Sequence, residues 1–321
     1  LINLGTPDSL KLWDIRKYIK QFLSDRRVIE LNPLIWQPIL RGIILNTRPF
    51  KTRRAYAKIW RQDTNESPLR YYTRRQAEML HNRIDHPNII VDWAMRYGNP
   101  SIESRIHSLQ QQGCESIVVL PLYPQYCAAT TATVCDEVFR VLQQMRWQPQ
   151  VQIVPRYYDH PDYIRLMVSQ LERQLERLEW RPQQIVLSYH GVPRTYLEQG
   201  DPYHCQCAVT TRLIREAWPY RDIPIETTFQ SRFGPAEWLQ PYTDATLKLL
   251  PTQGIYRIMI ATPGFVSDCV ETLEEIGMEG VNTFREAHGD QCHVVPCVND
   301  TPEHIRLLQR LIEPYLFASK K

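Results

Sequence analysis

The run QIVLSYH at residues 184–190 shows the pattern that decides the fold. It is short, rich in β-branched and aromatic residues, and closed by Gly191 and Pro193, as expected of a buried strand. From about residue 86 onward, similar runs alternate with amphipathic segments, which is typical of βα units around a parallel sheet. The strand candidates are residues 88–97, 116–123, 151–158, 184–190, 223–229, 256–265 and 293–298.

The length of the chain indicates more than one core. At 321 residues it exceeds the usual size of a compact domain, so two lobes or one large α/β domain are expected. A helical pattern at 161–179 follows the third strand candidate and is predicted to bridge two similar halves. The predicted domains are therefore 1–155, which includes an apolar segment at 22–50, and 156–321.

The last segment is predicted to be a helix over residues 302–317. Thr301 supplies an N-cap, Pro302 suits the first helical position, and Glu303 favours the positive end of the helix. The sequence does not decide whether this helix packs on the first lobe or on the second.

Composition and charge exclude several classes of protein. Hydrophobic residues make up 43% and the net charge is only +3, with basic and acidic residues interspersed, so no nucleic acid is expected as a partner. No apolar stretch reaches the ~20 residues that cross a bilayer, and the N-terminus lacks a signal-peptide layout, so a cytoplasmic protein is expected. The 8 cysteines show no framework spacing and are expected to be reduced thiols.

The segment at 22–50 breaks the alternation, because it is apolar without a clean period. It carries four arginines, Arg26, Arg27, Arg41 and Arg48. One interpretation is an ordinary core helix pair. The other is a hydrophobic lip around a cleft, rimmed by guanidinium groups that suit carboxylates.

Two places after strand candidates carry polar groups, where α/β folds bind ligands. His190 follows a buried run, and its imidazole could accept a proton at neutral pH or serve only as a structural hydrogen-bonding group. After the run at 256–265, Ser267 or Asp268 could cap a helix on which Glu271, Glu275 and Glu279 recur at i, i+4 and i+8. Such a face repels itself, so it lies in solvent or holds a cation in transit.

Other chemistries have weaker support. His204, Cys205 and Cys207 form a second possible metal cluster, but residues two apart are awkward joint ligands on a helix, and no second pair with zinc-like spacing lies nearby. Dinucleotide, P-loop and nucleophile-elbow motifs are missing, and only 12 glycines occur in the chain.

Taken in order, these segments resemble the ferrochelatase family over essentially the whole chain. The matching segments are Asn3-Leu4-Gly5-Thr6-Pro7, Phe22-Leu23-Ser24-Asp25-Arg26-Arg27, Ser67-Pro68-Leu69, Tyr123-Pro124-Gln125-Tyr126, Ser188-Tyr189-His190-Gly191, Gly200-Asp201-Pro202-Tyr203, Phe229-Gln230-Ser231-Arg232-Phe233-Gly234-Pro235, Trp238-Leu239, Pro241-Tyr242-Thr243-Asp244 and Ser267-Asp268-Cys269 with Glu271-Thr272-Leu273-Glu274-Glu275. The resemblance implies two similar Rossmann-like lobes, each a parallel sheet flanked by helices, with a porphyrin cleft between them and no organic cofactor.

The resemblance also implies the roles of individual residues. His190 would accept pyrrole protons, and Glu271, on the same side of the ring, would assist proton removal or hold the iron. With these two, Asp268, Glu275 and Glu279 would form a metal path. The residues implied in substrate binding are Arg48 and Ser67 at the propionates, Arg96 and Tyr97 opposite His190, Tyr123 and Trp238 against the ring, and Leu4 beside it. Trp238 could equally belong to the core.

Three departures from the family pattern matter. Cys269 stands where many relatives have histidine, so an imidazole role is absent there. Asn65 and Glu66 replace the usual glycines before the Ser-Pro turn. Animal-type relatives hold a [2Fe–2S] cluster through one mid-chain and three C-terminal cysteines. Here the mid-chain position is Ala128 and the tail 318–321 has no cysteine, so no cluster is predicted.

The implied function is insertion of Fe²⁺ into protoporphyrin IX with release of two protons, the last step of haem biosynthesis. Porphyrin and ferrous iron would be its partners, together with peripheral membrane contact through the lip and an interaction with the preceding haem-pathway enzyme. Two alternatives stay open: an enzyme acting on coproporphyrin III, and a non-catalytic haem or porphyrin carrier in which His190 is an axial ligand.

Overall fold

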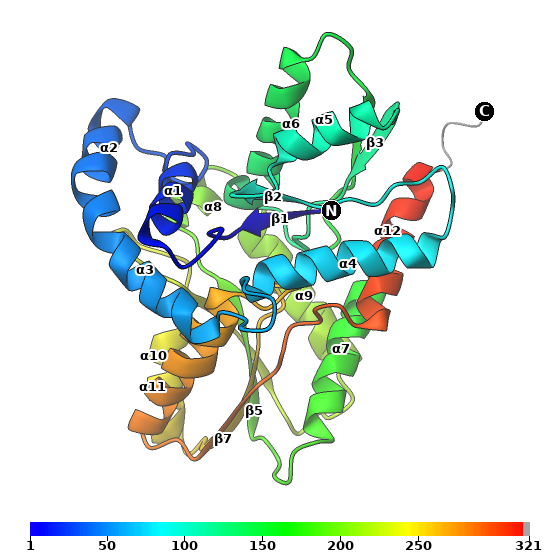
Figure 1. Ribbon diagram of the computed structural model, residues 1–321. Helices are drawn as coiled ribbons and strands as arrows, with labels where there is room; N and C mark the ends of the chain where they lie inside the picture. The colour runs from blue at the N-terminus through cyan, green and yellow to red at the C-terminus, as the bar shows by residue number, and fades with distance from the viewer. Residues whose placement is uncertain (317–321) are drawn as a thin grey trace. The chain divides into compact units, whose positions relative to one another are not determined.

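A computed structural model describes residues 1–316 of the chain, which divide into two compact units (Figure 1). The first unit contains residues 1–123, 127–155 and the segment from Asp300 onward. The second contains residues 124–126 and 156–299. The chain thus enters the second unit briefly at Pro124–Tyr126, returns there at Arg156, and leaves it again at Asp300.

The first unit is built on two pairs of parallel strands. β1 (Ile2–Gly5) pairs with β2 (Ala94–Tyr97), and β3 (Ser116–Val119) pairs with β4 (Gln150–Ile153). The pairs are joined because the Ile2 N–H donates to the Leu120 carbonyl (2.9 Å) and the Leu122 N–H donates to the Ile2 carbonyl (2.8 Å). The strand order is therefore β2-β1-β3-β4.

The second unit repeats this order in a single parallel sheet, β6-β5-β7-β8. Its strands are β5 (Gln184–His190), β6 (Ile225–Gln230), β7 (Arg257–Ala261) and β8 (Gln291–Val294). In both units the first strand lies between the second and the third along the chain, which is the arrangement of doubly wound α/β folds. The predicted fold class, parallel sheets flanked by helices, is confirmed.

Helices cover the sheets of both units. In the first unit they are α1 (Leu12–Leu23), α2 (Pro33–Ile39), the π-helix η1 (Leu40–Ile44), α3 (Leu45–Ile59), α4 (Pro68–Ile84), α5 (Ile102–Gln111), the π-helix η2 (Ala128–Ala132), α6 (Thr133–Gln144) and α12 (Pro302–Leu316). In the second unit they are α7 (Pro161–Leu175), α8 (Arg194–Glu198), α9 (Tyr203–Ala217), α10 (Thr243–Leu249), the 3₁₀-helix η3 (Leu250–Gln253), the π-helix η4 (Glu271–Gly280) and α11 (Val281–Glu286).

The terminal helix α12 belongs to the first unit and packs on α4. Arg83 at the end of α4 donates to the Gln309 amide oxygen, and Arg75 lies 3.5 Å from Asp300. Residue 317, the last of the helix expected from the sequence, lies outside the described residues, as does the tail 318–321.

Most strands are shorter than the sequence predicted, and prolines explain several of the differences. Proline has no N–H to donate to a neighbouring strand. Pro121 follows β3, Pro155 follows β4, Pro263 follows β7 and Pro296 follows β8, so the predicted runs stop pairing before their ends. β5 alone has the predicted bounds, and its apolar residues are fully buried, as in a parallel sheet covered on both faces.

Two glycines close the ends of β1 and β2. Gly5 and Gly98 have φ values of +118° and +88°, which L side chains rarely adopt. A Cβ on Gly5 would lie 1.8 Å from the Tyr97 carbonyl oxygen, and one on Gly98 would lie 2.5 Å from the Thr6 carbonyl oxygen. The two strand ends can therefore approach this closely only without side chains.

Replacing Gly5 with alanine should lower the free energy of unfolding by more than about 4 kcal/mol, because a main-chain carbonyl must move. Gly113→Ala is a matched control, since Gly113 also has positive φ (+83°) but open space around it. That variant should lose only about 1–2 kcal/mol from the left-handed backbone. Urea denaturation followed by circular dichroism measures both. Equal losses would contradict the close-approach argument.

Candidate active site

The carboxyl end of the second unit's sheet gathers the polar residues of the candidate site. His190 ends β5, Gln230 ends β6, and the chain after β7 leads into η4, which begins at Glu271. His190 and Gln230 are direct partners in the β5–β6 register. Because β6 and β7 flank β5 on opposite sides, their ends form the crevice in which α/β folds bind ligands.

The His190 imidazole is held in one tautomer. Its Nδ1 lies 2.6 Å from the Gly191 carbonyl oxygen. A carbonyl only accepts, so Nδ1 carries the proton and the Nε2 lone pair stays available. The main chain is also fixed, because the Tyr203 hydroxyl donates to the His190 carbonyl (2.9 Å). The ring is partly exposed and can act as a proton acceptor.

The acidic segment differs from the α-helix that the sequence predicted. Residues Glu271–Gly280 form the π-helix η4, a form common at functional sites. The Gln230 side-chain amide donates to the Glu271 carbonyl oxygen (3.0 Å), which draws that carbonyl toward a partner outside the helix. The three glutamates differ in burial: Glu271 and Glu275 are partly buried, whereas Glu279 is exposed.

Glu275 is the most constrained of the three glutamates. Its carboxylate accepts from the Ser231 N–H (2.7 Å), the Ser231 hydroxyl (2.6 Å) and the Gln230 amide (3.3 Å). Burial raises the pKa of Glu275, and the Glu271 charge adds to this, while the Ser231 hydrogen bonds and the His190 charge oppose it.

Asp268, expected as a metal ligand, is occupied by protein donors. It is buried, and its oxygens accept from the Asn299 amide (2.7 Å), the Thr272 hydroxyl (3.0 Å) and the Cys297 N–H (3.3 Å). Its own N–H donates to the Asn299 side-chain oxygen (2.8 Å). These contacts make Asp268 an anchor for the start of η4. The predicted capping role of Ser267 or Asp268 is wrong, because Val270 is the N-cap and no side chain caps the helix.

The cysteines near the site are buried thiols. Burial raises the pKa of Cys269 well above its usual range and does the same for Cys297. On α9, His204 stacks on Phe229, Cys205 is exposed and Cys207 is buried. Among residues 1–316, no three His, Cys, Asp or Glu side chains form a group that could hold a metal ion.

Trp238 lies behind the loop that follows β5. It is buried, its ring centre is 5.0 Å from that of Phe233, and a Cβ on Gly191 would lie 3.1 Å from the indole ring. The structure thus places this tryptophan in the core, which was one of its two interpretations.

The first unit presents a second polar edge at the end of β2. Arg96 donates to the Asp25 carboxylate (2.6 Å) and to the Thr133 carbonyl (2.7 Å). The Tyr97 hydroxyl donates to the same Asp25 oxygen (2.8 Å), and burial raises the pKa of Tyr97 above its ordinary value. Leu4 packs against the buried cluster that contains Tyr97. Arg96 and Tyr97, which are predicted to lie at the substrate, both donate to Asp25.

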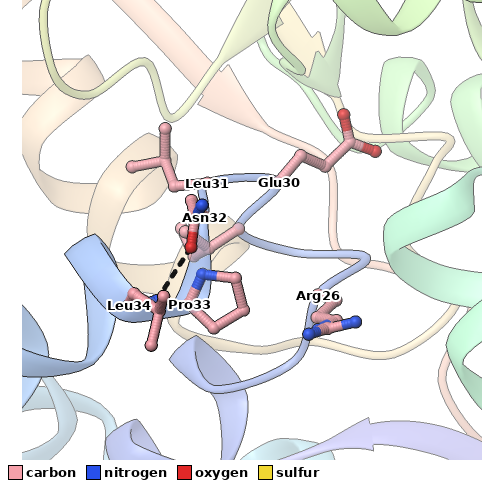
Figure 2. Close-up of a pocket in the computed structure, with 7 residues that line it drawn as sticks. Arg26, Glu30, Leu31, Asn32, Pro33 and Leu34 are labelled. Carbon is pink, nitrogen blue, oxygen red and sulfur yellow. Dashed lines mark hydrogen bonds between the residues drawn. The ribbon is translucent and has the colours of Figure 1, made fainter.

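The segment at 22–50 has both buried and exposed apolar residues. Leu40 and Leu45 are buried, whereas Leu34 is 85% exposed and Ile35 is 63% exposed. An inner row therefore packs as core, and an outer apolar row faces solvent. The pocket at its start has a volume of about 610 Å³ and is lined by Arg26, Ile29, Glu30, Leu31, Asn32, Pro33 and Leu34 (Figure 2).

The remaining predicted substrate residues lie in the first unit. Arg48 is exposed on α3, and Tyr123 is partly buried against the core beside β3. Ser67 is buried, and its hydroxyl accepts from the Arg70 N–H (3.2 Å) as the N-cap of α4. This cap explains why serine stands there.

Sequence reasoning did not name Gln230, Ser231 or Asp25 as site residues. Their roles depend on partners far along the chain. Asp25 and Arg96, for example, are 71 positions apart. Two signals were present: Gln230 directly follows the strand run at 223–229, and Ser188 is the one small polar residue inside the apolar run at 184–190.

Comparison with known proteins gives consistent results. The family model described as Ferrochelatase matches residues 1–316. A ferrochelatase of Allorhizobium ampelinum is 54% identical over 97% of this chain and 91% of its own length. One of Rhizobium meliloti is 52% identical over 97% of this chain and 92% of its own length.

Among solved structures, SirB from Bacillus subtilis with Fe³⁺ is similar in fold. The TM-score is 0.55 at 13% identity, over 77% of this chain and 90% of that one. SirB in complex with cobalt gives a TM-score of 0.54 at 10% identity, over 76% of this chain and 87% of that one. At this level of identity, these similarities show only a shared α/β fold.

The Asp25–Arg96 pair should matter far more to stability than an exposed pair. Its side chains are 9% and 12% exposed, compared with 48% and 44% for Asp136 and Arg27. Asp25→Asn should lower the free energy of unfolding by about 3 kcal/mol, because it leaves a buried guanidinium uncompensated. Asp136→Asn, the control, should cost less than about 1 kcal/mol. Urea denaturation decides, and similar losses would refute the argument.

Proposed function

The chain belongs to the ferrochelatase family, and on that premise we propose that it inserts Fe²⁺ into protoporphyrin IX to give protohaem. The observation that carries the proposal is the edge of the second sheet. There an oriented imidazole ends β5 beside Gln230, whose amide donates to the Glu271 carbonyl and to the Glu275 carboxylate at the start of η4. Within haem biosynthesis this is the last step, and the class of the enzyme is a lyase.

The reaction needs bases more than it needs a resident cofactor. Two pyrrole N–H protons leave as one divalent ion enters, so charge is conserved. We assign proton acceptance to the His190 Nε2 and proton removal or iron holding to Glu271, whose main chain Gln230 fixes. Because a planar ring hides its nitrogen lone pairs, the protein must also bend it, at a cost of several kcal/mol supplied by remote contacts.

The other residues divide by their surroundings. Glu275 and the exposed Glu279 supply carboxylates along η4 for incoming iron, while Asp268 holds the start of that helix. Arg48 on the exposed side of α3 pairs with a propionate. Tyr123 and Leu4 supply apolar contacts for the ring. Neither an organic cofactor nor an iron–sulfur cluster takes part.

Turnover tests the function. Wild-type protein mixed anaerobically with protoporphyrin IX and Fe²⁺ should convert many equivalents of porphyrin, followed by its absorption bands. His190→Ala should abolish insertion while porphyrin still binds, because the proton acceptor is lost. His204→Ala is the matched control, since that imidazole stacks on Phe229 and should be dispensable for catalysis.

Other outcomes identify the alternatives. Conversion that stops at one equivalent indicates a carrier with His190 as an axial ligand. Faster turnover of coproporphyrin III than of protoporphyrin IX identifies the other substrate. Wild-type rates in His190→Ala would remove the assigned base.

The exposed apolar row of the lip is suited to contact with a membrane surface. There the protein would bind its hydrophobic porphyrin substrate and the preceding enzyme of the pathway. No helix within residues 1–316 is long and apolar enough to cross a membrane. The contact proposed is therefore peripheral, through Leu31, Leu34 and Ile35, with the basic side chains of α3 nearby.

Leu34→Glu with Ile35→Glu should reduce co-sedimentation with vesicles of phosphatidylcholine and phosphatidylglycerol, because two exposed apolar side chains proposed to enter the membrane surface become charged. Trp147→Glu, another exposed apolar residue (48%) outside the lip, is the control and should sediment like wild type. Sedimentation unchanged in the lip variant would argue against the contact.

A further inference from the structure

A chain of buried hydrogen bonds runs behind the candidate active site in the second unit. The Ser188 hydroxyl donates to the Gln230 side-chain oxygen (2.8 Å), and it also lies 2.8 Å from the Thr243 hydroxyl. The Thr243 hydroxyl in turn lies 2.8 Å from that of Thr228. All four residues are buried, and the hydroxyls of Ser188, Thr243 and Thr228 have no part in the chemistry assigned above.

This chain determines which way the Gln230 amide faces. An amide oxygen only accepts, so the Ser188 donor fixes the oxygen on the sheet side. The NH₂ group must then point to η4, where it donates to the Glu271 carbonyl (3.0 Å) and to the Glu275 carboxylate (3.3 Å). Turned the other way, the amide would present its oxygen to both acceptors and repel them.

The sheet geometry couples this arrangement to the imidazole. Ser188 is two residues before His190 on β5, so both side chains lie on one face of the sheet. Gln230 is the register partner of His190 on β6. The first turn of η4 is thus tied, through one amide, to the strand that carries His190.

We propose that Ser188 and Thr243 are positioning residues, which act through Gln230 to hold Glu271 and Glu275 in place against His190. The proposal rests on the function proposed above. Neither hydroxyl touches the porphyrin or the iron. Their loss should slow the chemical step without weakening porphyrin binding.

Steady-state kinetics of Ser188→Ala and Thr243→Val test the proposal. In each, kcat should fall roughly 10- to 100-fold, as is usual when a group that orients a reactive residue is removed, with KM for the porphyrin unchanged. Thr243→Ser keeps the hydroxyl and should restore most of kcat. Thr211→Val is the matched control, because it removes a buried hydroxyl bonded to Tyr189 and Thr227 that does not reach Gln230.

A double-mutant cycle separates positioning from a general loss of stability. In a Gln230→Leu background, Ser188→Ala should cause no further fall in kcat, because both act through the same amide. The proposal would be overturned if Ser188→Ala lowered kcat in the Gln230→Leu background by the same factor as in the wild type. Wild-type kcat in both Ser188→Ala and Thr243→Val would also overturn it. If Ser188→Ala does not fold, the Thr243→Val and Thr243→Ser pair decides. Absence of wild-type turnover would instead defeat the proposed function.

Discussion

The parallel register of β5 with its two neighbours is the constraint on which the candidate site depends. It sets His190 opposite Gln230 on one side and aligns Leu187 with Ala261 on the other. A slip of one residue would turn Tyr189 to the face that His190 now occupies, since side chains alternate along a strand. Burial on both faces of β5 makes such a slip costly, because apolar residues fill every position but Gln184, Ser188 and His190.

The acidic residues near the carboxyl end of this sheet have different roles, because they differ in burial and in hydrogen-bond partners. Asp268 accepts three protein hydrogen bonds and anchors a helix, Glu275 is held by Ser231 and Gln230, and Glu279 lies in solvent. In the first unit, a buried carboxylate likewise holds the groups around it, because Asp25 ties the start of the lip to the end of β2. In each unit a polar network thus fixes the edge where strands end, and ordinary apolar packing supplies the rest.

Much of the fold could be predicted, because strand runs and prolines are local signals. The run at 184–190 has the bounds of β5, and the βα alternation led to the correct fold class. The type of helix at Glu271–Gly280 could not be predicted, since it involves an amide from β6, 41 positions away. Spacing of glutamates by four residues indicated a shared face, but only packing decides which carboxylates are enclosed.

The sequence by itself determined that the chain is an α/β protein built on parallel strands, with an imidazole at a strand end and an acidic segment after another strand. It also contained the motifs that place the chain in its family. Only the tertiary structure decided that Gln230 links those two features, and that Ser188 and Thr243 orient it. The physical reason is that periodicity reports which face a residue takes, whereas a hydrogen bond depends on which distant group the fold brings within about 3 Å.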